Sequence, residues 1–188
     1  APSGQLGPLG VHYAAAAAYR PIRASFEAFK QYEFTEDDNK NAALINEIKK
    51  PDLYALEVQC VELIKAFPDF DYSSAALYTL GASYLTFAQM LFEVPEPAGM
   101  DDEMLDMYYE ALDELRIPVE DKGKARLQAV LEKAKAEKRW SEWTTKTLDF
   151  LAQSFPSEFA HEVPEIRGEG DSTLVPMAGP IAPAIEAP

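Results

Sequence analysis

The sequence predicts an all-α fold on three observations. Apolar residues recur at helical spacing along most of the chain, and no alternating run indicates more than a few residues of strand. Short stretches rich in proline and glycine separate these periodic segments. The chain has 188 residues, nearly half of them apolar, which is enough for one domain with a real core. We therefore expect about seven or eight helices packed as helical hairpins.

The N-terminal part predicts the first helices. Residues 10–34 form two helices, or one helix kinked at Pro21, because a proline inside a helix removes a hydrogen bond. Residues 37–50 form a polar helix with Thr35 as its N-cap. Residues 51–67 form the next helix. One apolar stripe runs along it and consists of Leu53, Leu56, Cys60, Leu63 and Phe67.

The rest of the helical region follows in order. Residues 73–94 predict a helix whose opening serines suit an N-cap, and the proline-rich residues 95–99 end it. Residues 101–115 predict an acidic helix, which residues 117–123 end. The last two helices form a hairpin and occupy residues 124–140 and 141–156.

The chain divides into a helical domain, residues 1–156, and a tail, residues 157–188. The tail has five prolines and three glycines in 32 residues, so we expect it to be extended or disordered unless something holds it. Residues 37–50 and 93–121 are expected as inserts that interrupt the regular spacing of the helical domain.

One short stretch, "ALYTLGASY", indicates how the helices pack. Leu77, Leu80, Gly81 and Tyr84 stand at the relative positions of the first helix of a tetratricopeptide repeat. Gly81 has no side chain, so a neighbouring helix backbone can approach it closely, while the larger residues fill the space around it. A Phe-Pro pair precedes this motif and a second follows the last helix. These pairs are Phe67-Pro68 and Phe155-Pro156.

On these residues the chain resembles the tetratricopeptide proteins of bacterial cell envelopes. "FPDFDYSSAALYTLGASY" is similar to repeats of the periplasmic partner of the Tol-Pal system, and residues 119–156 are similar to large gliding-motility and envelope proteins. The resemblance covers residues 9–156. It implies a divergent solenoid of helical hairpins in an extracytoplasmic scaffold that docks other proteins of an envelope complex. It implies neither catalytic residues nor a cofactor.

Charge excludes some partners. The formal net charge is −15, so the chain lacks the surplus cations of a nucleic-acid binder, and anionic membrane surfaces are disfavoured. No apolar run is long enough to predict a membrane span. Residues 93–121 hold eleven Asp or Glu against Arg116 alone. They predict either a landing site for a basic partner or divalent cation, or, the favoured interpretation, intramolecular pairing with the basic residues between Lys122 and Arg139.

Five residues are candidates for partner binding. In a tetratricopeptide array, Tyr78, Leu85 and Gln89, together with Ala82, face the concave groove, which is mostly apolar and suits a hydrophobic peptide, a helix or the tail. Trp140 and Trp143 lie three residues apart on one helix face. They predict either core packing between the last two helices or a docking patch.

Candidate chemistry is sparse. Glu110, Asp113 and Glu114 share a helical neighbourhood but read as a solvated face rather than a hydrolase pair, and "DDEMLD" lacks the order of a calcium loop. Cys60 is expected in the core. His12 and His161 have no nucleophile beside them in sequence. We therefore expect a scaffold or adaptor, not an enzyme, with no cofactor and no metal. The alternative is a receptor-like domain that captures a ligand in an apolar helical groove.

Overall fold

The computed structural model describes residues 7–159, and all regular structure in that range is helical, which confirms the all-α prediction. The prediction of an extended tail concerns residues 160–188, which lie outside the described residues, and residues 157–159 belong to a short helix. The elements are α1 (Pro8–Phe29), α2 (Asp38–Ala43), the π-helical η2 (Leu44–Lys49), α3 (Lys50–Ala66), α4 (Phe70–Phe92), α5 (Asp102–Glu137), α6 (Glu142–Ser154) and α7 (Pro156–Phe159).

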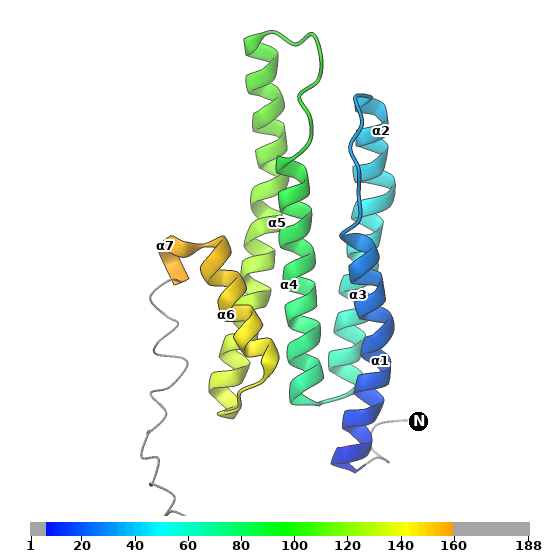
Figure 1. Cartoon of the computed structure of the whole chain (residues 1–188), viewed down its shortest axis with the longest axis vertical. Coiled ribbons are helices and arrows are strands. Elements are labelled where there is room, and N and C mark those ends of the chain that lie inside the picture. Colours follow the sequence, from blue (N-terminus) through cyan, green and yellow to red (C-terminus); the bar gives the residue numbers. More distant parts are fainter. Residues whose placement is uncertain (1–6, 160–188) are drawn as a thin grey trace, which may run out of the picture.

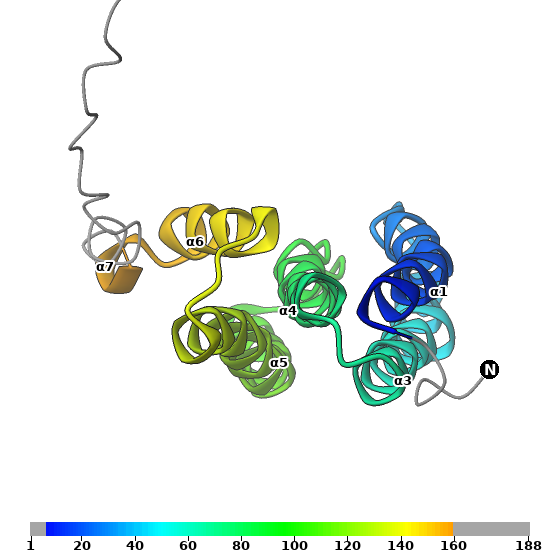
Figure 2. The same cartoon turned by 90° about the horizontal axis from the view of Figure 1, so that it is seen from below.

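The helices stand side by side with their long axes roughly parallel (Figure 1). Seen end-on, α4 lies between the α1–α3 pair and the α5–α6 pair (Figure 2). Sixteen of the 23 residues of α4 are buried, which a helix covered on both sides requires. One hydrophobic cluster lies between α4 and the α1–α3 side, and a second lies between α4 and the α5–α6 side. The predicted stripe of α3 contributes Leu53, Leu56, Cys60 and Leu63 to the first cluster.

The predicted close approach at Gly81 is confirmed, and its partner is a second glycine. A Cβ atom at Gly81 would lie 3.0 Å from the carbonyl oxygen of Gly123 in α5 and 2.7 Å from Leu127 Cγ. A Cβ atom at Gly123 would lie 3.1 Å from the carbonyl oxygen of Gly81 and 2.8 Å from Leu85 Cγ. The two glycines therefore bring the α4 and α5 backbones together, and a leucine from each helix closes over the contact.

The predicted break at residues 117–123 is wrong, because α5 continues through Pro118. Pro118 has no N–H, so the carbonyl of Glu114, four residues earlier, lacks its helical hydrogen bond. Both residues are exposed, so water can donate to that carbonyl instead. The same holds for α1, where Pro21 and Ala17 are both exposed. Of the two predictions for the first segment, the single helix is right.

The helix starts also differ from the prediction. Asp37, not Thr35, caps α2 by accepting hydrogen bonds from the N–H groups of Asn39 and Lys40. The helix expected from residue 73 begins at Phe70, because Asp69 caps it through the N–H of Tyr72. An Asp cap accepts as well as a Ser or Thr cap, so spacing alone did not choose between them.

Lys49 links α1 to η2. Its side chain is buried, and Nζ donates to the carbonyls of Phe29 at 2.7 Å and Gln31 at 2.6 Å, beyond the last turn of α1. Burial lowers the pKa of Lys49. The ammonium lies over the rings of Phe29 and Tyr32, which with the carbonyls replace part of its hydration.

Candidate interaction surfaces

The first half of α5 leaves the bundle. Figure 1 shows it rising beyond the C-terminal end of α4, with the 93–101 loop beside it. None of residues 102–122 is buried, and the first buried residue of α5 is Gly123. Asp101 caps the helix by accepting from the N–H of Met104, and Tyr109 donates to Glu96 of the loop. These contacts, together with the partly buried Tyr108, Leu112 and Val119, which contact the rest of the protein, hold this half of α5.

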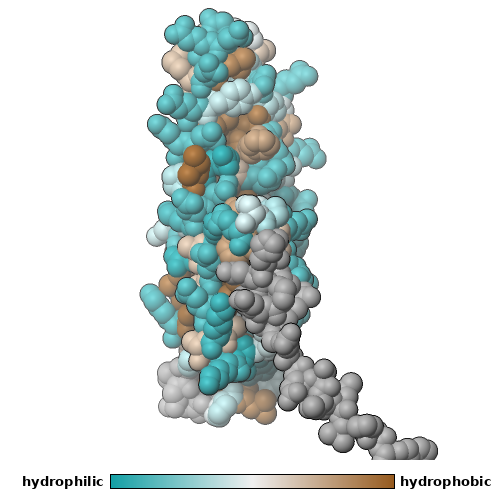
Figure 3. Space-filling view, turned by 90° about the vertical axis from the view of Figure 1, so that its left-hand side faces the viewer, coloured by the Kyte–Doolittle hydropathy of each residue, from teal (hydrophilic) through white to brown (hydrophobic). Residues whose placement is uncertain are grey.

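We call residues 102–122 the α5 projection. One set of its exposed apolar residues lies on a single side of the helix. Met104, Met107, Ala111 and Leu115 are exposed and recur at steps of three and four residues, which places them on one side. The exposed Asp102, Asp106 and Asp113 lie on the opposite side, together with the exposed Tyr109 and Ile117. Seen from the side that carries α5, α6 and α7, apolar side chains stand among hydrophilic ones in the upper half of the molecule (Figure 3).

The favoured interpretation of the acidic residues, intramolecular pairing with the basic residues 122–139, is wrong. Both groups lie on the continuous helix α5, so they cannot form two helices side by side. The basic residues instead pair with carboxylates outside the projection or in their own half of α5; the pairs are Lys124–Glu158, Arg126–Glu57, Lys133–Glu137 and Arg139–Asp71. Within residues 7–159, the ion pairs of the projection are those of Arg116 with Asp113 and Glu120.

An apolar cleft lies at the base of the projection. It has a volume of about 390 Å³ and is formed by α2, η2, the end of α4, the 93–101 loop and α5. Ile45, Leu91 and Val94 line it from one side, and Tyr108 and Leu112 from α5. Burial, and then the charge of Asp38, raises the pKa of Tyr108, so its hydroxyl stays protonated at neutral pH. Sequence reasoning missed this cleft because residues 37–50 and 93–121 were interpreted as separate inserts.

The groove residues named from the sequence do not all lie on one open surface. Tyr78 packs against the rings of Trp143 and Phe150, so α6 covers it. Leu85 is 8% exposed and covers Gly123. Gln89 is exposed and donates to Glu93. Leu85 and Gln89 also line a hollow of about 330 Å³ with Phe92, Arg116, Glu120 and Phe155.

The two tryptophans occupy different environments. Trp143 is partly buried and stacks with Tyr19 of α1 and Tyr78 of α4, so it bridges the two halves of the bundle. Trp140 is 45% exposed, and its indole N–H donates to Thr145. Trp143 therefore packs on α1 and α4 rather than between the last two helices, as the core interpretation had it, whereas Trp140 presents an aromatic surface at the α5–α6 turn.

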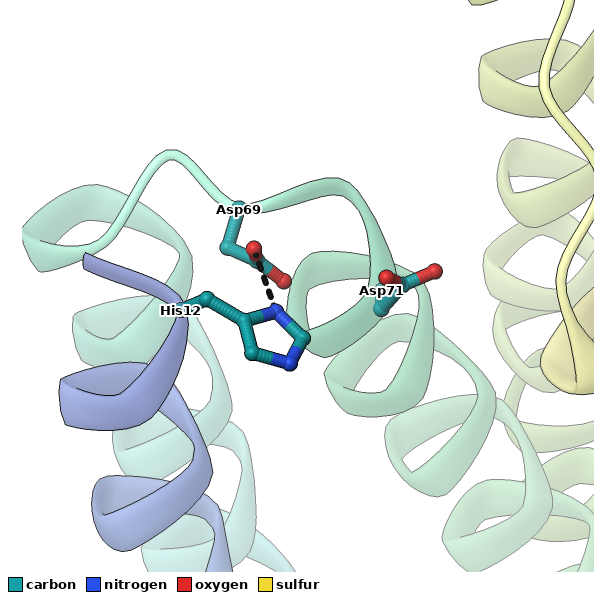
Figure 4. Close-up of side chains that lie close together, drawn as sticks. All are labelled: His12, Asp69 and Asp71. Atoms are coloured by element: carbon teal, nitrogen blue, oxygen red, sulfur yellow. Dashed lines mark hydrogen bonds and ion pairs between the residues drawn. The ribbon is translucent and has the colours of Figure 1, made fainter. Parts of the chain in front are cut away.

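His12, Asp69 and Asp71 come together where α1 meets the start of α4 (Figure 4). Their nearest ligand atoms lie within 4.8 Å of one another. Each has a partner in the protein. His12 Nδ1 is 3.0 Å from Asp69 Oδ2, Asp69 also caps α4, and Asp71 lies 3.8 Å from Arg139. An imidazole and two carboxylates suit a transition-metal ion, yet these contacts already account for them as a link between helices. No residue spacing in the sequence indicates this cluster.

The single cysteine is unsuited to nucleophilic chemistry. Cys60 is fully buried, and burial raises the pKa of its thiol to about 12. The thiolate, which is the reactive form, is therefore scarce at neutral pH. Glu110 and Glu114 are exposed on the projection, and Asp113 pairs with Arg116.

Comparison with protein-family models, with curated proteins and with solved structures finds no match to the chain. Within residues 7–159, no helix combines the length and the hydropathy that crossing a bilayer needs. Function therefore has to be argued from the surfaces described above.

Proposed function

We propose that this chain is a non-catalytic scaffold or adaptor that binds other proteins. The observation that carries the proposal is the α5 projection, whose 21 residues, 102–122, include no buried residue. Most helices of proteins are stabilised mainly by packing an apolar face against another part of the fold. A helix half that displays Met104, Met107 and Leu115 to solvent is suited to a partner that covers them.

The tetratricopeptide-like interpretation supports the same class of function. Successive helices α3, α4, α5 and α6 pack against their neighbours in the chain, as helical hairpins do. The glycine of the repeat-like motif lies at the α4–α5 contact. We propose that this is a divergent repeat array. The further proposal of a bacterial envelope complex rests on the sequence resemblance of residues 51–94 and 119–159.

Affinity capture tests the scaffold proposal. The full chain is compared with a variant in which Met104 and Met107 are both serine, and captured proteins are identified by mass spectrometry. We expect a defined set of partners with the unchanged chain, and loss of some of them with the variant. Because the replaced residues lie outside the core, the two proteins should unfold at the same temperature. Capture of no partner by either protein contradicts the proposal.

A second function is favoured by the apolar cleft. At about 390 Å³ it is large enough for a small apolar ligand, and ligand sites are typically apolar with a few polar groups. Tyr108 and the exposed Asp38 and Asn39, which also line the cleft, supply such groups. The alternative proposal is therefore capture of a small, mostly apolar molecule.

Native mass spectrometry of the purified full chain tests the alternative. A retained molecule of defined mass supports it, provided that the mass disappears in Ala42→Trp, which fills the cleft from α2. A matched variant, Ala17→Trp, adds the same side chain to an exposed position of α1 and should keep the molecule. Retention by both variants would assign the molecule to another part of the protein.

A further inference from the structure

The exposed apolar residues of the α5 projection form a continuous seam. Met104, Met107, Ala111, Leu115 and Pro118 follow one another at steps of three or four residues, and all five are exposed. The projection is about 30 Å long at 1.5 Å per residue. Such a ridge fits the groove between side-chain rows of another helix. The seam therefore matches a helix of similar length rather than a compact ligand.

Three carboxylates flank this seam along one edge. Glu103, Glu110 and Glu114 lie on the same side of α5, since steps of seven and four residues return to one face. All three are exposed, and within the described residues none takes part in an ion pair. Carboxylates beside an apolar seam select lysine or arginine on the helix that packs there, as charges flanking a coiled-coil seam do.

We propose that the α5 projection docks a basic amphipathic helix of a partner protein. The apolar side of that helix covers Met107 and Leu115, and its Lys or Arg side chains reach Glu103, Glu110 and Glu114. The inference deepens the proposed scaffold function and rests on it. A second copy of this chain is a poor occupant, because each copy carries a net charge of −15 and the same acidic edge.

Methionine suits this role. Its unbranched side chain and polarisable sulfur let one surface adapt to irregular apolar partners. The long stems of Lys and Arg would lie across Met104 and Met107 while their charged ends meet the carboxylates. The lysine and arginine side chains of the partner thus cover the apolar seam and also pair with the carboxylates beside it.

A designed peptide provides the probe. It is a helix of about 20 residues with leucines on one side and lysines beside them, matched to the length of the projection. A scrambled peptide of the same composition and a version with glutamate in place of lysine are the controls. Binding to the full chain is measured by fluorescence anisotropy at low and at physiological salt. We expect the designed peptide to bind, with an affinity that falls as salt rises.

Two triple variants of the full chain locate the site. Glu103→Lys, Glu110→Lys and Glu114→Lys reverse the acidic edge, whereas Glu33→Lys, Glu62→Lys and Glu132→Lys change exposed residues elsewhere. Each set raises the formal charge from −15 to −9, because every substitution adds two. We expect the first set to weaken peptide binding by roughly tenfold or more and the second by less than about threefold.

Three results overturn the inference. They are equal weakening by both variants, equal binding of the scrambled peptide, and a dimer in sedimentation that the first variant dissociates. The last result assigns the surface to a second copy. A fourth result overturns the inference but leaves the proposed function intact: affinity capture retains the same defined set of partners with the unchanged chain and with the first triple variant.

Discussion

Gly81 and Gly123 each lie against the other's carbonyl oxygen, so α4 and α5 touch backbone to backbone. A Cβ atom on either residue would come within 3.1 Å of that oxygen and closer still to a leucine. The pair lies in the α4–α5 contact, which joins the two halves of the bundle.

Replacing Gly81 or Gly123 by alanine should therefore destabilise the protein. Overpacking costs about 1–3 kcal/mol, which exceeds the gain of up to about 1 kcal/mol from the better helix propensity of alanine. The double variant should lose less free energy of unfolding than the sum of the two single losses, because a helix displaced by one methyl group already makes room for the other. Urea unfolding measures all three. Stabilisation by either single change would contradict this account.

Lys49→Met should destabilise the end of α1. Methionine keeps much of the apolar stem but donates no hydrogen bond, so the carbonyls of Phe29 and Gln31 lose their partner. Leaving buried acceptors unsatisfied costs about 1–3 kcal/mol. Lys50→Met is the matched control, since Lys50 bonds only to the exposed side chain of Asn46, and it should change the free energy of unfolding by less than about 0.5 kcal/mol. Equal losses in the two variants would disprove the role of Lys49.

Trp143→Ala and Trp140→Ala should separate the two environments. The first removes a ring that stacks on Tyr19 and Tyr78, and we expect a loss of about 2–3 kcal/mol in the free energy of unfolding. The second removes an exposed ring and should cost less than about 1 kcal/mol. Chemical denaturation of both proteins makes the comparison. A larger loss for Trp140 would show that the α5–α6 turn, not Trp143, joins the helices.

Asp69 has two roles that substitutions can separate. Asp69→Asn keeps an oxygen for the N–H of Tyr72 but removes the charge that faces His12. Asp69→Ala removes both the capping oxygen and the charge. It should lower the free energy of unfolding by about 1 kcal/mol more than Asp69→Asn does, which is the usual contribution of an N-cap. Thermal unfolding of both variants, each also in a His12→Ala background, isolates the His12 contribution. If Asp69→Asn lowers the unfolding temperature as much as Asp69→Ala does, the contact with His12 rather than the cap stabilises the start of α4.

Stability should fall at alkaline pH. Burial raises the pKa of Cys60 from 9.0 to about 12 and that of Tyr19 from 10.0 to about 12. The folded protein therefore keeps protons that the unfolded chain releases, so the stabilisation is complete below about pH 9 and is lost as the pH rises towards about 12. Lys49, with its lowered pKa, works in the opposite direction.

Cys60→Ala tests this pH dependence directly. The difference in unfolding free energy between the unchanged protein and the variant should shrink by more than about 1 kcal/mol between about pH 8 and about pH 11. Guanidinium titrations at the two pH values measure it, and comparison with the variant cancels the contributions of Lys49 and Tyr19. A difference that does not change with pH would mean that the thiol ionises equally in both states.

The sequence predicted the contact between helices better than it predicted where the helices begin and end. The Leu-Gly-Tyr motif identified Gly81 as a contact, since the absence of a side chain has one simple steric consequence. Its partner Gly123 lay in the stretch 117–123, which Pro118 made look like a turn. A proline is tolerated inside a helix where it is exposed, and that exposure depends on the tertiary fold. The helix starts were misplaced for a similar reason, as Asp69 and the nearby serines are equally good caps.

The candidate site was predictable only in part. The acidic run and its methionines were evident in the sequence, but the absence, within residues 7–159, of ion pairs between that run and residues 122–139 depended on α5 being continuous. The cluster of His12 with Asp69 and Asp71 joins residues 57 or more positions apart, and no local spacing encodes such a meeting. Tyr78 was expected on an open groove, and α6 covers it with Trp143 and Phe150.

The continuity of α5 also has a mechanical consequence. A helix of 36 residues is about 54 Å long, so the projection and the packed half form one continuous rod. Gly123 is the first buried residue of this rod and lies against Gly81 of α4. A partner that displaced the N-terminal end of α5 would therefore also load the α4–α5 contact, because one helix carries both.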